Sequence, residues 1–352
     1  MVMGGYMASM IVNEALLHAD SVIIGDAEIS YPLMLKDYEN KGKLQRIYDN
    51  PIEKLSDLPV PRYELLTEKS IGNMLPVQAG RGCPYTCSFC SIACMYKGKY
   101  LFRPVDEVIR DIKVIRDLGF RRFYLIDDNL VANKNYLEEL CYKIKPLKMK
   151  WATQCSLYIG DDPKLLKLVT EAGAVMMSFG IESITQEGLD KLNKAWLRVE
   201  DHKRLISNIT RSKIMISSEM IIGTDSDTEE SIKATYDFIQ ENRIPIPRFY
   251  ILTPTPGSEL YDQYKAQGRL ITEDWKLYDG SVCVYQPAKI SPEKLSDSFW
   301  WLYRKVFSWK SILRRTIFNP AILHSPMVYL FALAVNLHYR KYVMKKVPPN
   351  IL

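Results

Sequence analysis

The sequence is poor in cysteine, with seven in 352 residues, and this number is odd. A disulfide framework needs many paired cysteines in an exported chain, and we expect no signal peptide here. Reduced cysteines therefore predict a cytoplasmic protein. No apolar run reaches the roughly 18 residues that cross a bilayer. The formal net charge of +6 is mild for this length and does not by itself indicate a nucleic-acid partner.

What the chain does contain is a regular alternation of strand-like and helix-like segments. A hydrophobic share of 47% is ordinary for a protein with a substantial core, and the length allows one large domain with appendages or two domains. We predict strands at 77–80, 123–127, 151–156, 175–181, 215–222 and 248–252. We predict helices between them at 105–118, 135–145, 163–172, 199–212 and 228–242. Six such units joined by right-handed crossovers indicate an α/β fold, a parallel sheet curled into a partial barrel.

Three of the seven cysteines lie in one short loop after the first predicted strand. Cys83, Cys87 and Cys90 have the spacing C-x3-C-x2-C. Cysteine thiolates hold iron–sulfur clusters, and three of them can occupy three corners of a 4Fe–4S cube and leave the fourth iron open for a small molecule. A zinc site usually pairs two C-x2-C knuckles. Cys94 could add a fourth thiolate, but no second knuckle follows, and we expect Cys94 to be a packing residue.

With Phe89 directly before its last cysteine, this loop resembles the signature of the radical S-adenosylmethionine (SAM) enzymes. The resemblance implies a 4Fe–4S cluster whose open iron chelates the amino and carboxylate groups of SAM. It also implies reductive cleavage of SAM to methionine and a 5′-deoxyadenosyl radical, and an electron donor such as flavodoxin or ferredoxin. Because the cofactors carry this chemistry while the protein orients them and excludes water, no catalytic residue is expected beyond the cluster and SAM.

Polar residues follow all six predicted strands, at the edge where parallel α/β sheets bind ligands. Acidic residues at such positions can also be helix N-caps. The radical SAM resemblance assigns Asp127 or Asp128 to the ammonium group of SAM and Glu182 to its ribose. It assigns Phe89 and Ile222 to an apolar shelf for the adenine, and polar contacts with ribose or carboxylate to Gln154 and Ser218.

In the N-terminal segment we predict a helix near 8–18 and a second at 31–42 that ends at a glycine cap. This segment resembles the last part of the cobalamin-binding domain that precedes many radical SAM cores. The resemblance rests on Gly4-Gly5, which could also form a simple turn, and on the run Gly25-Asp26-Ala27-Glu28. The cobalt-ligating histidine of that domain lies in a D-x-H-x-x-G motif, which this sequence lacks, and His18 is the only histidine before position 202. We therefore expect residues 1–45 to be a remnant of the domain, which counts against cobalamin binding.

The remaining boundaries follow from composition and from a second resemblance. Prolines punctuate residues 46–72, which we predict to be a linker, and the radical SAM core should span 73–290. Residues 253–261 and 268–270 resemble the T-P-x-P-G-T-x-L-Y and G-R-L elements of the cobalamin-associated subfamily. That subfamily includes methyltransferases, ring-forming enzymes and lipid-modifying enzymes.

Residues 291–352 are predicted to form a helical, basic C-terminal extension. From residue 299 onward the chain has nine lysines or arginines and no acidic residue. Such helices could cover the open side of the barrel, could lie at a membrane surface, or both. No RNA-binding module is recognisable, and we expect no nucleic-acid partner.

Together these features predict a radical SAM enzyme that acts on a small, hydrophobic or lipid substrate by methyl transfer, C–H functionalisation or ring formation. The enzyme should be cytoplasmic, with peripheral contact at the inner face of a membrane as a further expectation. The alternative is a non-catalytic protein that only binds an iron–sulfur cluster or another metal.

Overall fold

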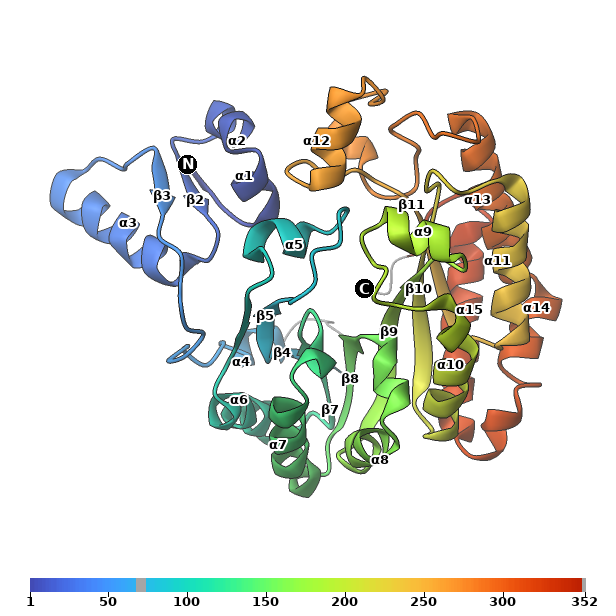
Figure 1. The fold of residues 1–352 in the computed structure, drawn as a ribbon. Helices are drawn as coiled ribbons and strands as arrows, with labels where there is room; N and C mark the ends of the chain where they lie inside the picture. Colours follow the sequence, from blue (N-terminus) through green and yellow to red (C-terminus); the bar gives the residue numbers. More distant parts are fainter. Residues whose placement is uncertain (68–73, 350–352) are drawn as a thin grey trace.

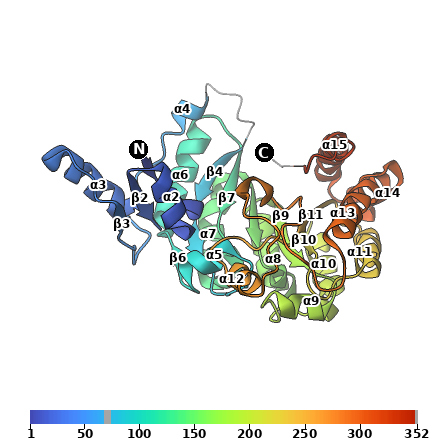
Figure 2. The ribbon, with the colours of Figure 1, turned by 90° about the horizontal axis from the view of Figure 1, so that it is seen from above.

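The computed structural model describes residues 1–67 and 74–349, and its centre is a six-stranded parallel sheet (Figure 1). The strand order is β11-β10-β9-β8-β7-β4. The strands are β4 (Leu75–Gln78), β7 (Arg122–Ile126), β8 (Lys150–Cys155), β9 (Ala174–Glu182), β10 (Met215–Ile222) and β11 (Ile246–Ile251). Seen from above, the sheet curls but does not close, because β4 and β11 are its two edges (Figure 2). The predicted partial barrel is confirmed.

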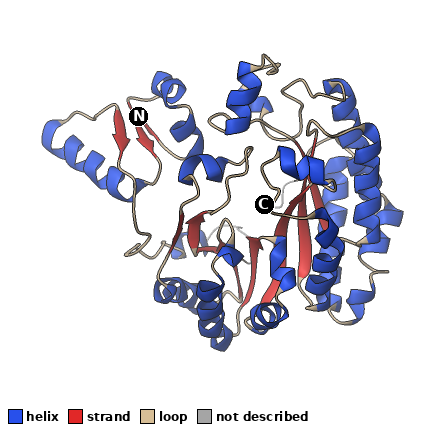
Figure 3. Cartoon of the chain, viewed as in Figure 1, coloured by secondary structure: helices blue, strands red, loops and turns tan. Residues whose placement is uncertain are grey.

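Helices cover the outer face of the curled sheet (Figure 3). They are α6 (Val105–Asp117), α7 (Lys134–Ile144), α8 (Pro163–Glu171), α10 (His202–Arg211) and α11 (Glu229–Glu241). In α6, Val108, Ile109, Ile112 and Ile115 lie on one face and are buried against the sheet. Full burial of one such side chain is worth about 2 kcal/mol, so this face fixes the position of α6.

Residues 1–49 form a separate small layer beside the barrel, a three-stranded parallel sheet with order β1-β2-β3. Its strands are β1 (Val2–Met3), β2 (Ser21–Ile24) and β3 (Ile47–Asp49), and its helices are α1 (Tyr6–Met10), α2 (Val12–His18) and α3 (Ala27–Lys41). Because β3 pairs with β2, the sheet extends past residue 45 into the predicted linker. The predicted change from linker to core at residues 72 and 73 lies outside the described residues.

Two of the predicted N-terminal helices have other bounds than expected. The single helix expected at 8–18 is two helices, because Ile11 takes a non-helical conformation with φ −121° and ψ 55°. The break lets α1 contact α5 (Ser91–Tyr96) while α2 packs on β2. The helix expected at 31–42 begins at Ala27, and it ends at the predicted glycine cap, since Gly42 has φ 62°.

Four helices follow β11 in sequence: α12 (Glu259–Ala266), α13 (Pro292–Val306), α14 (Trp309–Arg315) and α15 (Pro326–Val343). Two short helices lie earlier in the chain, α4 (Glu64–Thr67) and α9 (Gln186–Lys191). Helix α13 packs on α11 and β11, and α15 reaches β11 at the edge of the opening. The fully buried Arg315 joins these parts, since its guanidinium donates to the carbonyls of Ile244, Pro245 and Val306. Within residues 1–67 and 74–349, no helix is long and apolar enough to span a membrane.

Candidate functional site

The three cysteines lie in the loop between β5 (Gly80–Gly82) and α5, above the carboxyl ends of the barrel strands. Strand β5 pairs with β6 (Tyr100–Phe102) in an antiparallel ribbon that carries the loop. Gly82 makes this path possible: its φ is 89°, and a Cβ there would lie 2.2 Å from the carbonyl oxygen of Lys99. The conformation of Gly82 therefore helps to fix the path of the backbone that leads into the cysteine loop.

All three cysteines are free thiols and half-buried. Burial raises the pKa of each thiol, that of Cys87 to about 11, and Cys83, Cys87 and Cys90 lie close enough to affect one another electrostatically. The Lys194 ammonium acts in the opposite direction on Cys87, and the Asn129 side-chain amide lies 3.7 Å from the Cys83 sulfur. Since the metal-binding form is the thiolate, binding must displace protons from this loop.

Three thiols in one loop are the donor set that a 4Fe–4S cube with one open iron takes, because a cube spreads its thiolate ligands over separate irons. In the described part of the chain, no group of three His, Cys, Asp or Glu side chains is placed to hold a single metal ion. Cys94 lies one turn away in α5, with its sulfur donating to the Cys90 carbonyl at 3.2 Å. The three thiols of the motif thus lie in one loop, while the sulfur of Cys94 is engaged with the backbone.

A cavity of ≈ 420 Å³ opens at the carboxyl ends of the strands. Three of the residues predicted for SAM line it, namely Phe89, Gln154 and Glu182. Ser218 and Ile222 do not line it. They are 0% and 2% exposed on the other face of β10, and side chains alternate along a strand.

Their neighbours Glu219 and Ile221 face the cavity, together with Arg248 and Tyr250 of β11. The sequence prediction did not include these four residues, because on β10 it named Ser218 and Ile222, whose side chains lie on the other face, and it named no site residue on β11. The available signal was a single charged residue within each strand, Glu219 in β10 and Arg248 in β11.

Glu182 is held in an uncommon backbone conformation, with φ 61° at the end of β9. A non-glycine residue in this region marks local strain, which clusters at functional sites. Its carboxylate accepts from the Lys194 ammonium at 2.9 Å, and Lys194 also donates to the Gly180 carbonyl at 2.9 Å. Burial opposes the charge of Lys194, but the Glu182 carboxylate and the nearby Cys87 raise its pKa above the ordinary value. The sequence prediction missed Lys194, because its partner lies 12 residues earlier across a turn and a short helix.

Asp127 and Asp128, the predicted contacts of the SAM ammonium, also support the loop. Asp127 accepts from the Tyr100 hydroxyl at 2.6 Å and from the Asn129 amide at 2.8 Å, while its second oxygen is buried with no partner among the described residues. Asp128 accepts from the backbone amide of Gly82 at 2.7 Å. The two carboxylates therefore border the cysteine loop from the end of β7.

Burial raises the pKa of Asp127 from 3.8 to about 7, against the lowering effect of its two hydrogen bonds. A raised folded-state pKa means that the stability from this group is complete below its unfolded pKa and is lost as the pH rises through about 7. As the pH rises from about 4 to above 7, the free energy of unfolding of the wild-type protein should thus fall by about 4 kcal/mol relative to that of Asp127→Asn. Urea unfolding of both proteins between about pH 4 and pH 8 measures this. A difference that does not vary with pH would show that the buried carboxyl does not titrate.

A second charged pair lies in the same cavity. Arg248 is paired with Glu219, and the Ser178 hydroxyl donates to the Glu219 carboxylate at 2.7 Å. The Nε of Arg248 is buried and has no partner among the described residues. The cavity lining therefore combines apolar side chains such as Ile221 and Leu252 with the half-buried Arg248. It also includes three carboxylates, those of Glu182, Glu219 and Asp279.

The N-terminal layer is attached beside the cysteine loop. Arg81, two residues before Cys83, donates to Asp26 at 2.6 Å and to Glu28 at 2.7 Å. A cavity of ≈ 1080 Å³ lies between α3, the residues after β3 and the edge of the barrel. His18 pairs with Glu14 on the exposed side of α2 and is not among the residues that line this cavity.

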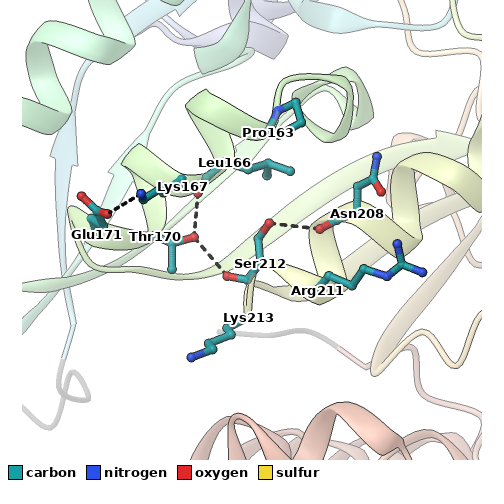
Figure 4. A pocket seen from close by; sticks show the side chains of 9 residues that line it. All are labelled: Pro163, Leu166, Lys167, Thr170, Glu171, Asn208, Arg211, Ser212 and Lys213. Carbon is teal, nitrogen blue, oxygen red and sulfur yellow. Dashed lines mark hydrogen bonds and ion pairs between the residues drawn. The ribbon is translucent and has the colours of Figure 1, made fainter.

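Another hollow, of ≈ 410 Å³, lies between α8 and the end of α10 (Figure 4). The Thr170 hydroxyl there donates to the carbonyls of Leu166 and Ser212. These residues precede β9 and β10, so the hollow lies at the opposite end of the strands from the cysteines. It plays no part in the candidate site.

Comparison with known proteins agrees with this geometry. The Radical SAM superfamily profile matches residues 77–239. The chain is 31% identical over 325 residues to bacteriochlorophyllide d C-12(1)-methyltransferase of Chlorobaculum tepidum, covering 90% of this chain and 71% of that protein. It is 27% identical over 238 residues to the anaerobic magnesium-protoporphyrin IX monomethyl ester cyclase of Cereibacter sphaeroides, covering 66% of this chain and 38% of the cyclase.

Among solved structures, the cobalamin-dependent SAM radical enzyme OxsB, with aqua-cobalamin and SAM bound, has the same fold with a TM-score of 0.67 at 13% identity. The match covers 97% of this chain and 59% of OxsB, so the chain spans less than two thirds of that protein. The methyltransferase of C. tepidum, in contrast, is matched over most of its length. These matches show that the chain belongs to the Radical SAM superfamily of enzymes.

Proposed function

We propose that Cys83, Cys87 and Cys90 hold a 4Fe–4S cluster and that the enzyme uses it to cleave SAM reductively. The observation that carries this proposal is the set of three free thiols in one loop over the strand ends, with the fourth cysteine of that region bonded to the backbone. When bound and reduced, such a cluster supplies the electron that breaks a carbon–sulfur bond of SAM. An electron donor such as flavodoxin or ferredoxin belongs to the same proposal.

The protein side chains then bind and orient SAM. Glu182 would accept from the ribose hydroxyls and Phe89 would pack on the adenine, since both line the cavity next to the cysteine loop. Asp128 fixes the loop through the Gly82 amide, and Asp127 offers its unpartnered oxygen to an ammonium group. The side chains of Ser218 and Ile222 lie on the outer face of β10. Their expected contact with SAM stays a prediction, and it would have to be made by their backbone atoms.

For the substrate we propose a hydrophobic small molecule or lipid. The names of the relatives refer to tetrapyrroles, one protein being a methyltransferase and another a cyclase, and the cavity has the apolar Ile221 and Leu252 beside Arg248. A substrate with an apolar body would pack on these two apolar side chains. Its polar groups would meet Arg248, which is paired with Glu219, and the carboxylates of Glu182 and Asp279. Such a molecule partitions into lipid, so peripheral membrane contact of residues 291–352 is part of the proposal. The proposal includes two reactions for this substrate, methyl transfer and C–H functionalisation with ring formation.

Product analysis separates the alternatives. The reconstituted protein, incubated without oxygen with SAM and dithionite, should release 5′-deoxyadenosine and methionine. S-adenosylhomocysteine that appears only when cobalamin is added would identify methyl transfer. Its absence with and without cobalamin would identify a non-methylating reaction. Iron binding without any SAM cleavage would contradict the proposed function and would leave the non-catalytic iron–sulfur protein.

A further inference from the structure

The C-terminal segment has an exposed apolar surface that the candidate site does not use. It consists of Phe318 after α14, Leu323 in the short turn before α15, and Met327, Leu330 and Phe331 in the first turns of α15. Leu323 is 81% exposed and Met327 is 75% exposed. These exposed apolar residues all lie within residues 318–331, and exposed apolar residues that gather in one region mark an interaction site more often than single ones do. We call these five residues the C-terminal apolar surface.

Helix α15 is apolar on two opposite sides. One side packs inward through Tyr329, Ala332, Tyr339 and Val343, which are buried. The other carries Met327, Leu330 and Phe331 and continues to Leu337 one and a half turns later, all of them exposed. A helix that covers only a soluble core would be polar on this outer side.

The helix cannot rotate to bury its outer side. Asn336 is fully buried on the inner side, where it donates to the Pro245 carbonyl at 2.9 Å and accepts from Arg315 at 2.9 Å. Buried polar groups lose much stability when they are left without partners. The two hydrogen bonds therefore fix which side of α15 faces outward.

The charges around this surface indicate its partner. Residues 299–352 contain nine lysines or arginines and no acidic residue, and of these nine Arg315 is fully buried. Lys341 follows Leu337 by four residues and so continues the outer side of α15, while Lys345 lies in the turn just past the end of the helix; both are exposed. A second copy of the chain would bring the same positive charges face to face, which disfavours self-association. Anionic lipid headgroups over an apolar layer match both the charge and the apolar residues.

We propose that the C-terminal apolar surface docks on an anionic lipid bilayer, with Phe318, Leu323 and Phe331 in the headgroup boundary and Lys341 and Lys345 at the phosphates. This proposal names anionic lipid as the partner in the membrane contact of the proposed function. It depends on the proposed function only in assuming that the substrate is hydrophobic. Tyr339, on the inner side of the same helix, lies close enough to Arg248 to sense its charge. Docking would thus place the barrel cavity one helix away from the lipid.

Vesicle co-sedimentation of the full chain tests the proposal. The protein should sediment with phosphatidylcholine vesicles that contain phosphatidylglycerol, less with phosphatidylcholine alone, and less when salt is added. The double variant L323S/F331S should bind about tenfold more weakly. K341E/K345E should lose the preference for phosphatidylglycerol. L17S, which changes an equally exposed leucine on α2, should bind like the wild-type protein.

Three results would overturn the docking proposal: no binding to anionic vesicles, equal binding by L323S/F331S and wild type, or loss of binding in L17S as well. A wild-type dimer that L323S/F331S converts to a monomer would also overturn it, in favour of a second copy as the partner. Circular dichroism should show that the variants are folded, since all the changed side chains are exposed. Because the assay needs neither SAM nor reductant, docking and SAM cleavage can fail separately.

Discussion

Replacing Cys87 by alanine should abolish SAM cleavage and leave the reconstituted protein with little bound iron. Loss of a group that only supports a metal ligand typically costs 10–100-fold in affinity or activity, so loss of the ligand itself should cost more than about 100-fold. The expected reason is that two thiolates, Cys83 and Cys90, cannot hold three corners of a cube. Iron analysis and the rate of 5′-deoxyadenosine release measure the two effects.

Cys94→Ala is the matched control, because Cys94 lies in the same region and is also a free, half-buried thiol. Its sulfur donates to the Cys90 carbonyl, and this variant should keep its iron and its SAM cleavage. Full SAM cleavage by Cys87→Ala would refute the assignment of the cluster ligands. Loss of iron in Cys94→Ala but not in Cys87→Ala would show that the loop uses a different set of thiolates.

Lys194→Met should destabilise the protein by about 3–5 kcal/mol, because it leaves the Glu182 carboxylate buried without its cation. The side chains of Lys194 and Glu182 are each only 9% exposed, and they are 2.9 Å apart. Urea unfolding of the cluster-free protein measures the loss without interference from iron. The variant should also bind SAM more weakly, since Glu182 is the predicted ribose contact.

The double variant E182Q/K194M separates pairing from packing. If the cost of Lys194→Met arises from the unpaired carboxylate, removing both charges should recover most of the lost stability. Two equal and additive losses would instead mean that each side chain contributes through packing alone. A cost below about 1 kcal/mol for Lys194→Met, the size typical of an exposed pair, would contradict the buried geometry.

The barrel was predictable because its strands and helices have strong local patterns. Strand β10 has the bounds expected from the sequence, 215–222, and α6 differs by a single residue at its end. The N-terminal helix was not predictable in this way, because the break at Ile11 depends on contacts of α1 with α5. Local hydrophobic periodicity thus determines whether a segment is a helix or a strand, whereas tertiary contacts determine at which residues it begins and ends.

The candidate site was predictable only in part, for a related reason. The spacing of Cys83, Cys87 and Cys90 is a local signal and does not depend on the fold. Which side of β10 faces the cavity depends on the register of the sheet, and a shift by one residue exchanges Ser218 for Glu219. Lys194 and Arg248 act through partners on other elements, and such pairs cannot be read from one sequence.

The most direct test of the account is the electron paramagnetic resonance spectrum of the reduced, reconstituted protein with and without SAM. If Cys83, Cys87 and Cys90 hold a cube with one open iron, the protein should bind about four irons per chain and its signal should change when SAM is added. A signal that saturating SAM leaves unchanged would contradict the open corner on which the proposed function depends.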